Sequence, residues 1–100
     1  MKFTPQMGAR LDLQSEAVKE RARANIERWG GQTAHILMVC MAEELGEIAE
    51  AVLRISIDWE KTKEAYRDAE QEARDLGALC LQMAMLCQLA DRLAGEKANE

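Results

Sequence analysis

The sequence predicts a small all-α protein, and three observations lead to this fold class. The 100-residue chain is dominated by Ala, Leu, Met, Glu, Lys, Arg and Gln, the residues that lose least on entering a helix. Val, Ile and Thr never cluster into the alternating pattern of a strand, and proline occurs once. A chain of this length forms a single domain, residues 1–100, with one modest core. We therefore expect a helical bundle of about three main helices.

The first main helix is expected from about residue 11 to residue 29. Residues 1–10 are expected to form a loosely ordered N-terminal arm, because Pro5 and Gly8 oppose regular structure. The Gly30-Gly31 pair ends the helix, since paired glycines suit the left-handed turn at a helix C-terminus. A stripe at helical spacing is expected to face the core; it comprises Leu11, Ser15, Val18, Ala22, Ile26 and Trp29.

Two further helices follow. One is expected from about Gln32 to Ile55, with Thr33 as a possible cap. The other is expected from Trp59 or Glu60 to Ala94, with Gly95 as its end and with Ser56 or Asp58 as a cap. The apolar stripe of the earlier helix comprises Leu37, Cys40, Met41, Ile48, Ala51, Val52 and Ile55. The last helix is strongly polar in its first half.

The second half of the last helix, residues 76–93, is apolar almost all round. A helix of this kind must be buried all round, and three helices in one short chain cannot cover both of its faces. Ala78, Leu81, Met85 and Leu89 are expected on the face that the chain leaves open. Symmetric self-association is the usual way to cover such a face. We therefore expect a homodimer or homotetramer in which chains complete four-helix bundles together.

Charge and composition exclude some classes of protein. A formal net charge of −5 repels a polyanion, so no nucleic-acid partner is expected. No segment approaches the roughly 20 apolar residues of a membrane span, and the N-terminus lacks a signal-peptide pattern. Cys40, Cys80 and Cys87 form no CxxC pair or zinc spacing and are expected to be reduced core residues. A cytoplasmic location fits these features.

Two acidic motifs stand out: Glu44-x-x-Glu47 and Glu72-x-x-Asp75, separated by 24 residues. Residues three apart lie one turn apart on the same side of a helix, so each pair can chelate one cation. At about 100° per residue, Glu44 and Glu72 each fall in the middle of an apolar stripe. Glu47 and Asp75 each lie about 60° to one side. Glu43 and Glu50 point about 100° or more away.

Four inward carboxylates predict a metal site. Burying an unpaired carboxylate in an apolar environment has a prohibitive free-energy cost unless the carboxylate is neutralised or coordinates metal. A hard cation such as Mg²⁺, which prefers oxygen ligands, removes the conflict. One acid-x-x-acid motif usually marks only a solvated helix face, but two of them within apolar stripes favour the site. A di-iron centre is disfavoured, because neither motif contains the histidine of Glu-x-x-His.

The two motifs and their surroundings resemble the MazG-like all-α nucleoside triphosphate pyrophosphohydrolase superfamily, which includes MazG and the dimeric dUTPases. The resemblance covers roughly residues 25–95. It also includes residues 28–32 (RWGGQ), 43–51 (EELGEIAEA) and 89–93 (LADRL).

The resemblance implies hydrolysis of nucleoside triphosphates between the α and β phosphates, as nucleotide-pool house-cleaning, giving monophosphate and pyrophosphate. Glu44, Glu47, Glu72 and Asp75 would hold Mg²⁺ (or Mn²⁺) and carry the catalysis. A phosphoribosyl-ATP pyrophosphatase, which shares this fold and the use of carboxylates to hold a metal, is an alternative. A non-catalytic helical oligomerisation module is another.

Weaker candidates for substrate binding lie near the motifs. Arg54 and Lys61 are candidates to reach phosphates, although a solvated surface role fits them equally well. Trp29 is a candidate to stack on a base, and capping the end of the bundle is its more ordinary role. Asp68 is a spare candidate ligand, and His35, a lone histidine near a helix start, is expected to be structural.

Overall fold

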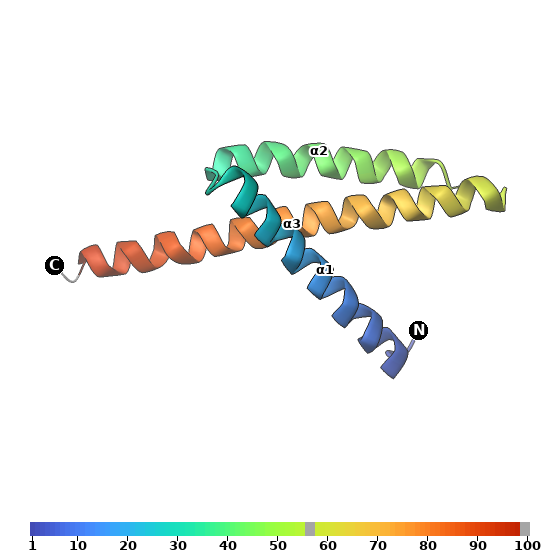
Figure 1. Ribbon diagram of the computed structural model, residues 1–100, viewed down its shortest axis with the longest axis horizontal. Helices are drawn as coiled ribbons and strands as arrows, with labels where there is room; N and C mark the ends of the chain where they lie inside the picture. Colours follow the sequence, from blue (N-terminus) through green and yellow to red (C-terminus); the bar gives the residue numbers. More distant parts are fainter. Residues whose placement is uncertain (56–57, 99–100) are drawn as a thin grey trace.

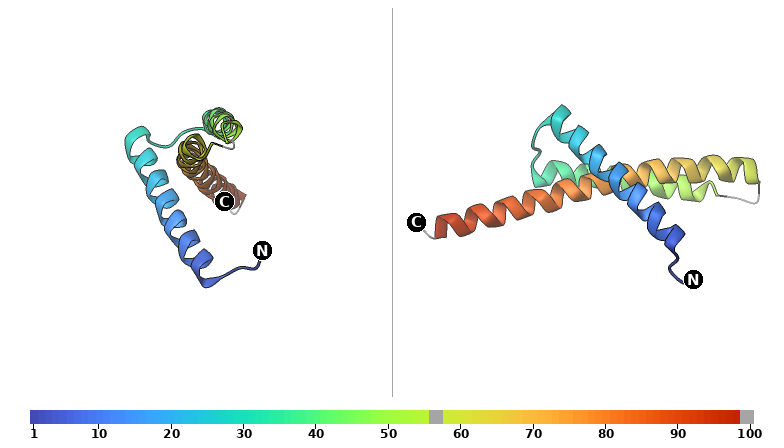
Figure 2. Two further views of the ribbon diagram at one scale, coloured as in Figure 1. Left: turned by 90° about the vertical axis from the view of Figure 1, so that its right-hand side faces the viewer. Right: turned by 60° about the horizontal axis from the view of Figure 1, so that its bottom comes forward.

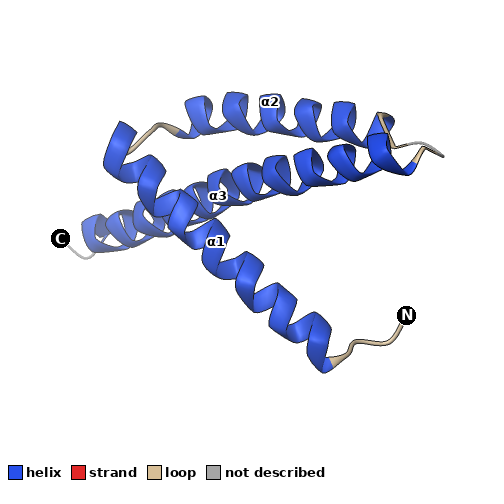
Figure 3. Ribbon diagram, turned by 45° about the vertical axis from the view of Figure 1, so that its right-hand side comes forward, coloured by secondary structure: helices blue, strands red, loops and turns tan. Residues whose placement is uncertain are grey.

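The computed structural model describes residues 1–55 and 58–98, which form three helices and no strand (Figure 3). The helices are α1 (Pro5–Trp29), α2 (Ala34–Leu53) and α3 (Trp59–Ala98). The all-α class and the number of main helices are thus as the sequence predicts.

Side-chain caps fix the start of α2 and the start of α3. The backbone N–H of Ile36 donates to Thr33 Oγ1 over 3.3 Å, so Thr33 caps α2 as predicted. The N–H of Glu60 donates to Asp58 Oδ1 over 3.0 Å, and these bonds satisfy donors that have no partner within the helix. Ser56, the other candidate cap, lies outside the described residues.

Two helix ends differ from the prediction. The helix α1 begins at Pro5, inside the expected N-terminal arm, because Thr4 Oγ1 accepts a hydrogen bond from the N–H of Met7 at 3.2 Å. Proline suits the first position of a helix, where its missing N–H is no loss. At the other end of the chain, α3 continues through Gly95 to Ala98. A glycine costs a helix about 1 kcal/mol relative to alanine but removes no hydrogen bond.

The helices α2 and α3 lie side by side, and α1 crosses α3 obliquely on another side (Figures 1 and 2). Among the described residues the backbones of α1 and α2 do not pack against each other. At the crossing a Cβ on Gly77 would lie only 3.2 Å from Val18 Cγ1, and Ala22 is buried nearby in α1. Small side chains therefore let α1 and α3 approach closely.

The core of a single chain is thin. Ala51, Ala65 and Ala78 are buried, and among the described residues Leu37 is the only large side chain that is fully buried. The two ends of the predicted α1 stripe are exposed, with Leu11 at 57% and Trp29 at 62%. Only the middle of α1 meets α3, so the ends have nothing to pack against.

Three further predictions about burial need correction. Cys80 and Cys87 are exposed rather than in the core, and both are free thiols, as is the half-buried Cys40. Ala78 is buried, although the sequence places it on the open face of α3. Val52, placed in the inward stripe of α2, is 49% exposed.

The overall shape is elongated, with extents of 62 × 32 × 24 Å and a radius of gyration of 17.1 Å. A compact 100-residue domain has a radius of gyration of about 13 Å. The chain exposes 8028 Å², whereas a folded monomer of 11.2 kDa exposes about 5,700 Å². The C-terminal part of α3 extends beyond the start of α2 (Figure 1).

By length and composition alone, α3 is the one described helix that meets the criterion for a membrane span. A core helix of a soluble protein meets the same criterion. The uncharged run of α3 lies between Asp75 and Asp91 and includes Gln82 and Gln88. This run is shorter than the roughly 20 apolar residues that cross a bilayer.

Candidate metal centre

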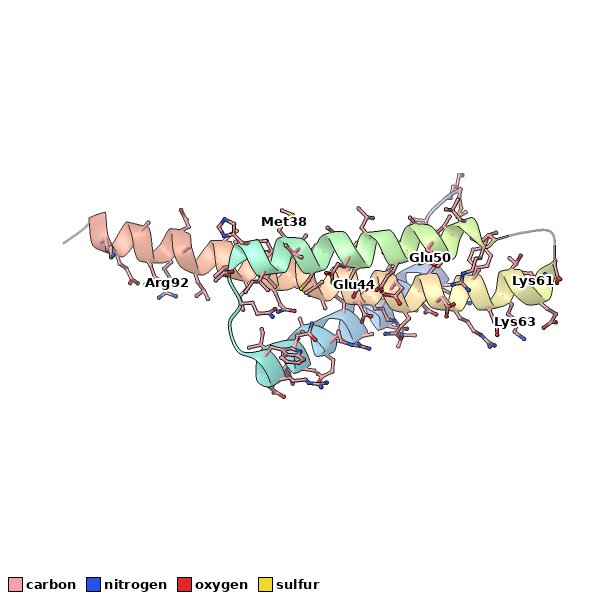
Figure 4. All side chains as sticks on the ribbon, turned by 90° about the horizontal axis from the view of Figure 1, so that it is seen from above. Met38, Glu44, Glu50, Lys61, Lys63 and Arg92 are labelled. Carbon is pink, nitrogen blue, oxygen red and sulfur yellow. The ribbon has the colours of Figure 1, made fainter. Side chains whose placement is uncertain are left out.

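Three of the four predicted carboxylates meet between α2 and α3. Glu44 comes from the middle of α2 (Figure 4), and Glu72 and Asp75 come from successive turns of α3. All three side chains are half-buried, and each offers one oxygen that lies within 4.8 Å of the others. The structure thus brings together residues that are far apart in the sequence, as the helix phases predict.

Glu47 completes the cluster at its exposed edge. Its carboxyl lies within hydrogen-bonding reach of Glu72, and this contact, followed by the negative charge of Glu72, raises the pKa of Glu47. A carboxyl group accepts a hydrogen bond from another carboxyl only if one of the two carries a proton. Crowding of negative charge around Glu47 is therefore the cause of its raised pKa.

Two oxygens of the cluster lack any donor. Glu44 Oε2 and Glu72 Oε2 are buried and have no hydrogen-bond partner among the N–H and O–H groups of the described residues. The carboxyl groups of Glu44 and Glu72 can hydrogen-bond to each other only through a shared proton. This contact is the largest cause of the raised pKa of Glu72, with burial and the charges of Glu44 and Asp75 adding to it. Buried acceptors without a donor are costly, and a cation would satisfy both.

Asp75 differs from the other carboxylates because α1 supplies a cation to it. Arg21 Nη1 lies 2.9 Å from Asp75 Oδ1, and Gln71 Nε2 donates to the same oxygen over 3.4 Å. The Asp75 side chain is 24% exposed and that of Arg21 is 45% exposed. The cluster is thus partly neutralised on the side that faces α1 and is not neutralised between Glu44 and Glu72.

A cleft opens on each side of the cluster. The first, of about 410 Å³, lies against α1 and is lined by Arg21, Asn25 and Trp29 together with Glu44 and Asp75. This volume falls in the range of small-molecule sites.

The second cleft, of about 390 Å³, is lined by Glu47 and Glu72 together with Arg54 and Asp68. The cluster is therefore reachable from two directions. Glu43 and Glu50, predicted to point away, are exposed and lie outside the group of close oxygens. Each lines the rim of one cleft.

The weaker candidates are distributed unevenly. Arg54 pairs with Asp68 at 2.7 Å, and both line the second cleft. Trp29 lines the first cleft, and the guanidinium of Arg28 lies 4.8 Å from the centre of its ring, so one face of the indole is covered. Lys61 lies near the start of α3 (Figure 4), about 16 Å along the helix axis from Glu72. His35 is exposed.

Two residues of the first cleft were not singled out from the sequence: Arg21 and Asn25. Asn25 Nδ2 donates over 2.9 Å to Oε1 of the buried Gln82. Both residues belong to α1 and reach the cluster only because α1 crosses α3 at Gly77. Their spacing of four places them on one helix face, but the sequence does not say which helix that face meets.

Comparison with known proteins gives no match to any family model, any curated protein or any solved structure. The observations that bear on function are therefore the carboxylate cluster, its clefts and the resemblance carried by the two acidic motifs.

Proposed function

We propose that the chain is a magnesium-dependent nucleotide pyrophosphohydrolase that cleaves nucleoside triphosphates between the α and β phosphates. One observation supports it above the others: three carboxylates from two helices converge, and two of their buried oxygens have no donor. The resemblance of the motifs to the MazG-like superfamily supplies the reaction.

Glu44, Glu72 and Asp75 are the residues proposed to hold Mg²⁺, with Mn²⁺ as an alternative ion. Held by these carboxylates, the ion would supply positive charge at the phosphate groups as water attacks. Glu47 lies outside the group of three close oxygens, so its carboxylate is the one left to accept a proton from the attacking water. Arg21 and Arg54 each line one cleft, and we propose that they contact phosphate oxygens.

The proposal includes self-association as a homodimer or homotetramer in the cytoplasm. A single copy exposes far more surface than a folded monomer of its mass, and four-helix bundles between chains would bury it. The phosphate-binding or base-binding residues of one chain would then lie close to a neighbouring chain.

The test is a pyrophosphate-release assay across a panel of canonical and modified nucleotides, with Mg²⁺ and with a chelator. We expect pyrophosphate and a nucleoside monophosphate, and no activity with the chelator. Orthophosphate as the sole product would contradict cleavage between the α and β phosphates, and activity that persists in the chelator would contradict the metal site. Release of pyrophosphate from phosphoribosyl-ATP alone would favour that narrower activity. No turnover of any substrate would favour an oligomerisation module.

A further inference from the structure

The outer face of α2 is apolar over nearly its whole length. Met38, Leu45 and Val52 are 58%, 59% and 49% exposed, and they recur every seven residues. Ala42 and Ala49 lie between them and are also exposed. Together these five residues form what we call the α2 seam.

The spacing of the α2 seam, alternating four and three residues, is that of a helix that packs along a second helix. The alanines in the seam, together with the exposed Gly46 beside it, would let a second backbone approach closely. No charged side chain of α2 lies within this face between Met38 and Leu53, because the four glutamates gather on the other side of the helix. In Figure 4, Met38 lies on the edge of α2 away from α1 and Glu44 on the opposite edge.

The exposed area of the whole chain is large enough for a partner of the chain's own size. The chain exposes 8028 Å², about 2,300 Å² more than a folded monomer of its mass. Permanent homodimers bury about 2,000–5,000 Å² in total, so each chain contributes about half of that. One partner of this chain's own size is therefore enough to account for the excess.

We infer that the α2 seam is the surface on which a second copy of this chain docks, seam against seam. The side chains of the seam follow the same order of sizes on both sides of Leu45, with an alanine next to the centre and a large residue at each end. Two copies related by a two-fold axis through the centre therefore place Leu45 opposite Leu45 whether the helices run parallel or antiparallel. This inference rests on the proposed self-association and is independent of the proposed activity.

The face of α3 on which the sequence predicts self-association is a less suitable docking surface for a second copy than the α2 seam. Leu81 and Met85 are 46% and 42% exposed, but they line a groove with Lys19, Arg23 and Glu27 of α1. A partner docking there would have to desolvate the charged rim that α1 provides. The α2 seam carries no such cost, and it leaves both clefts of the acidic cluster open.

The experiment compares Leu45→Lys with the matched variant Leu81→Lys by light scattering and sedimentation at micromolar concentration. We expect the wild type and Leu81→Lys to form a dimer and Leu45→Lys to have half that mass. Dissociation by Leu81→Lys but not by Leu45→Lys would keep self-association and overturn its placement. A wild type that is monomeric at 11.2 kDa would overturn both. If that monomer floats with phosphatidylcholine vesicles, the face would belong to a lipid surface.

A second measurement covers the case in which Leu45→Lys does not fold. Leu45→Cys is made in a chain whose three native cysteines are replaced by alanine, and it is oxidised under mild conditions. We expect a cross-linked dimer, because facing positions of two closely packed helices bring the Cα atoms near the 4.4–6.8 Å that a disulfide spans. Leu81→Cys in the same background is the control. Equal cross-linking of both variants, or of neither, would contradict the inference.

Discussion

The two packed sides of α3 treat polar groups in opposite ways. On the α1 side, Arg74 Nε donates to Gln14 Oε1 over 2.7 Å, and Gln14 Nε2 donates to Glu70 Oε2 over 2.7 Å. The buried Gln82 is also paired there, by Asn25. On the α2 side, Glu44 and Glu72 keep two buried oxygens without a donor.

The difference shows what each contact is suited to do. Satisfied polar groups fix how α1 lies on α3, since a misplaced helix would leave each of them unpaired. Unsatisfied carboxylates between α2 and α3 repel one another and favour any cation that fits between them. The α1 side thus has the character of a structural contact and the α2 side that of a binding site. Four predictions test this contrast.

The largest expected effect is on turnover. Glu44→Gln and Glu72→Gln should each lower the rate of pyrophosphate release by about 100-fold or more, because the metal supplies several kcal/mol of charge stabilisation. The metal-free fold should survive or become more stable, because repulsion between carboxylates is relieved. Glu43→Gln is the matched control and should be nearly silent. Equal damage from Glu43→Gln would show that the α2 side is not organised as described.

Mg²⁺ should stabilise the fold. A ligand that binds only the folded state at 100 times its Kd adds about 2.7 kcal/mol to the free energy of unfolding. We expect the melting temperature to rise with Mg²⁺ in the wild type and to rise much less in Glu44→Gln, as measured by calorimetry at fixed protein concentration. An equal rise in both chains would assign the effect to Mg²⁺ bound elsewhere.

The stability of the metal-free chain should depend on pH through Glu47 and Glu72. Both folded-state pKa values are raised above the ordinary value of 4.5, so the folded chain binds these protons more tightly than the unfolded chain. The resulting stability is fully present below pH 4.5 and is lost as the pH rises through the raised pKa values. Denaturant unfolding in a chelator measures this trend. The Glu72→Gln variant should flatten it, and an unchanged slope would place its origin outside the cluster.

The smallest effect concerns the α1 side. Gly77→Ala places a Cβ 3.2 Å from Val18 Cγ1, so the gain in helix propensity should be offset by a forced shift of α1. Gly95→Ala is the control, because a Cβ there has nothing within 4 Å. It should stabilise the chain by up to about 1 kcal/mol. If Gly77→Ala stabilises as much as Gly95→Ala, the close approach of α1 does not limit the size of the side chain at position 77.

The residues explain which features the sequence could predict. Composition and periodicity predict three helices, and the phases of Glu44 and Glu72 predict that these carboxylates converge, since both properties depend on single helices. The crossing of α1 was not predictable in the same way. It depends on a close contact between Gly77 and Val18, and neither residue carries a signal for its distant partner. Arg21 and Asn25 were therefore missed.

The helix ends show the same limit on a smaller scale. Thr4 and Pro5 are a start signal that the nearby Gly8 obscured. Gly95 carries an end signal that the continuing hydrogen bonds of α3 override. The exposed α2 seam was also missed, because the sequence assigned Val52 to the inward stripe of α2 and placed the interface between chains on α3.

The ion pair between Arg21 and Asp75 has a consequence for energetic coupling. Asp75 belongs both to the proposed cation site and to the contact that holds α1. The cation and Arg21 would therefore compete for the same carboxylate. If a bound cation weakens the ion pair between Arg21 and Asp75, then that ion pair must weaken cation binding by the same free energy, because coupling between two sites is reciprocal. The position of α1 would then depend on whether the acidic cluster holds a cation, and cation binding would depend on the position of α1. Removing the guanidinium should raise cation affinity while loosening the helix that lines the first cleft.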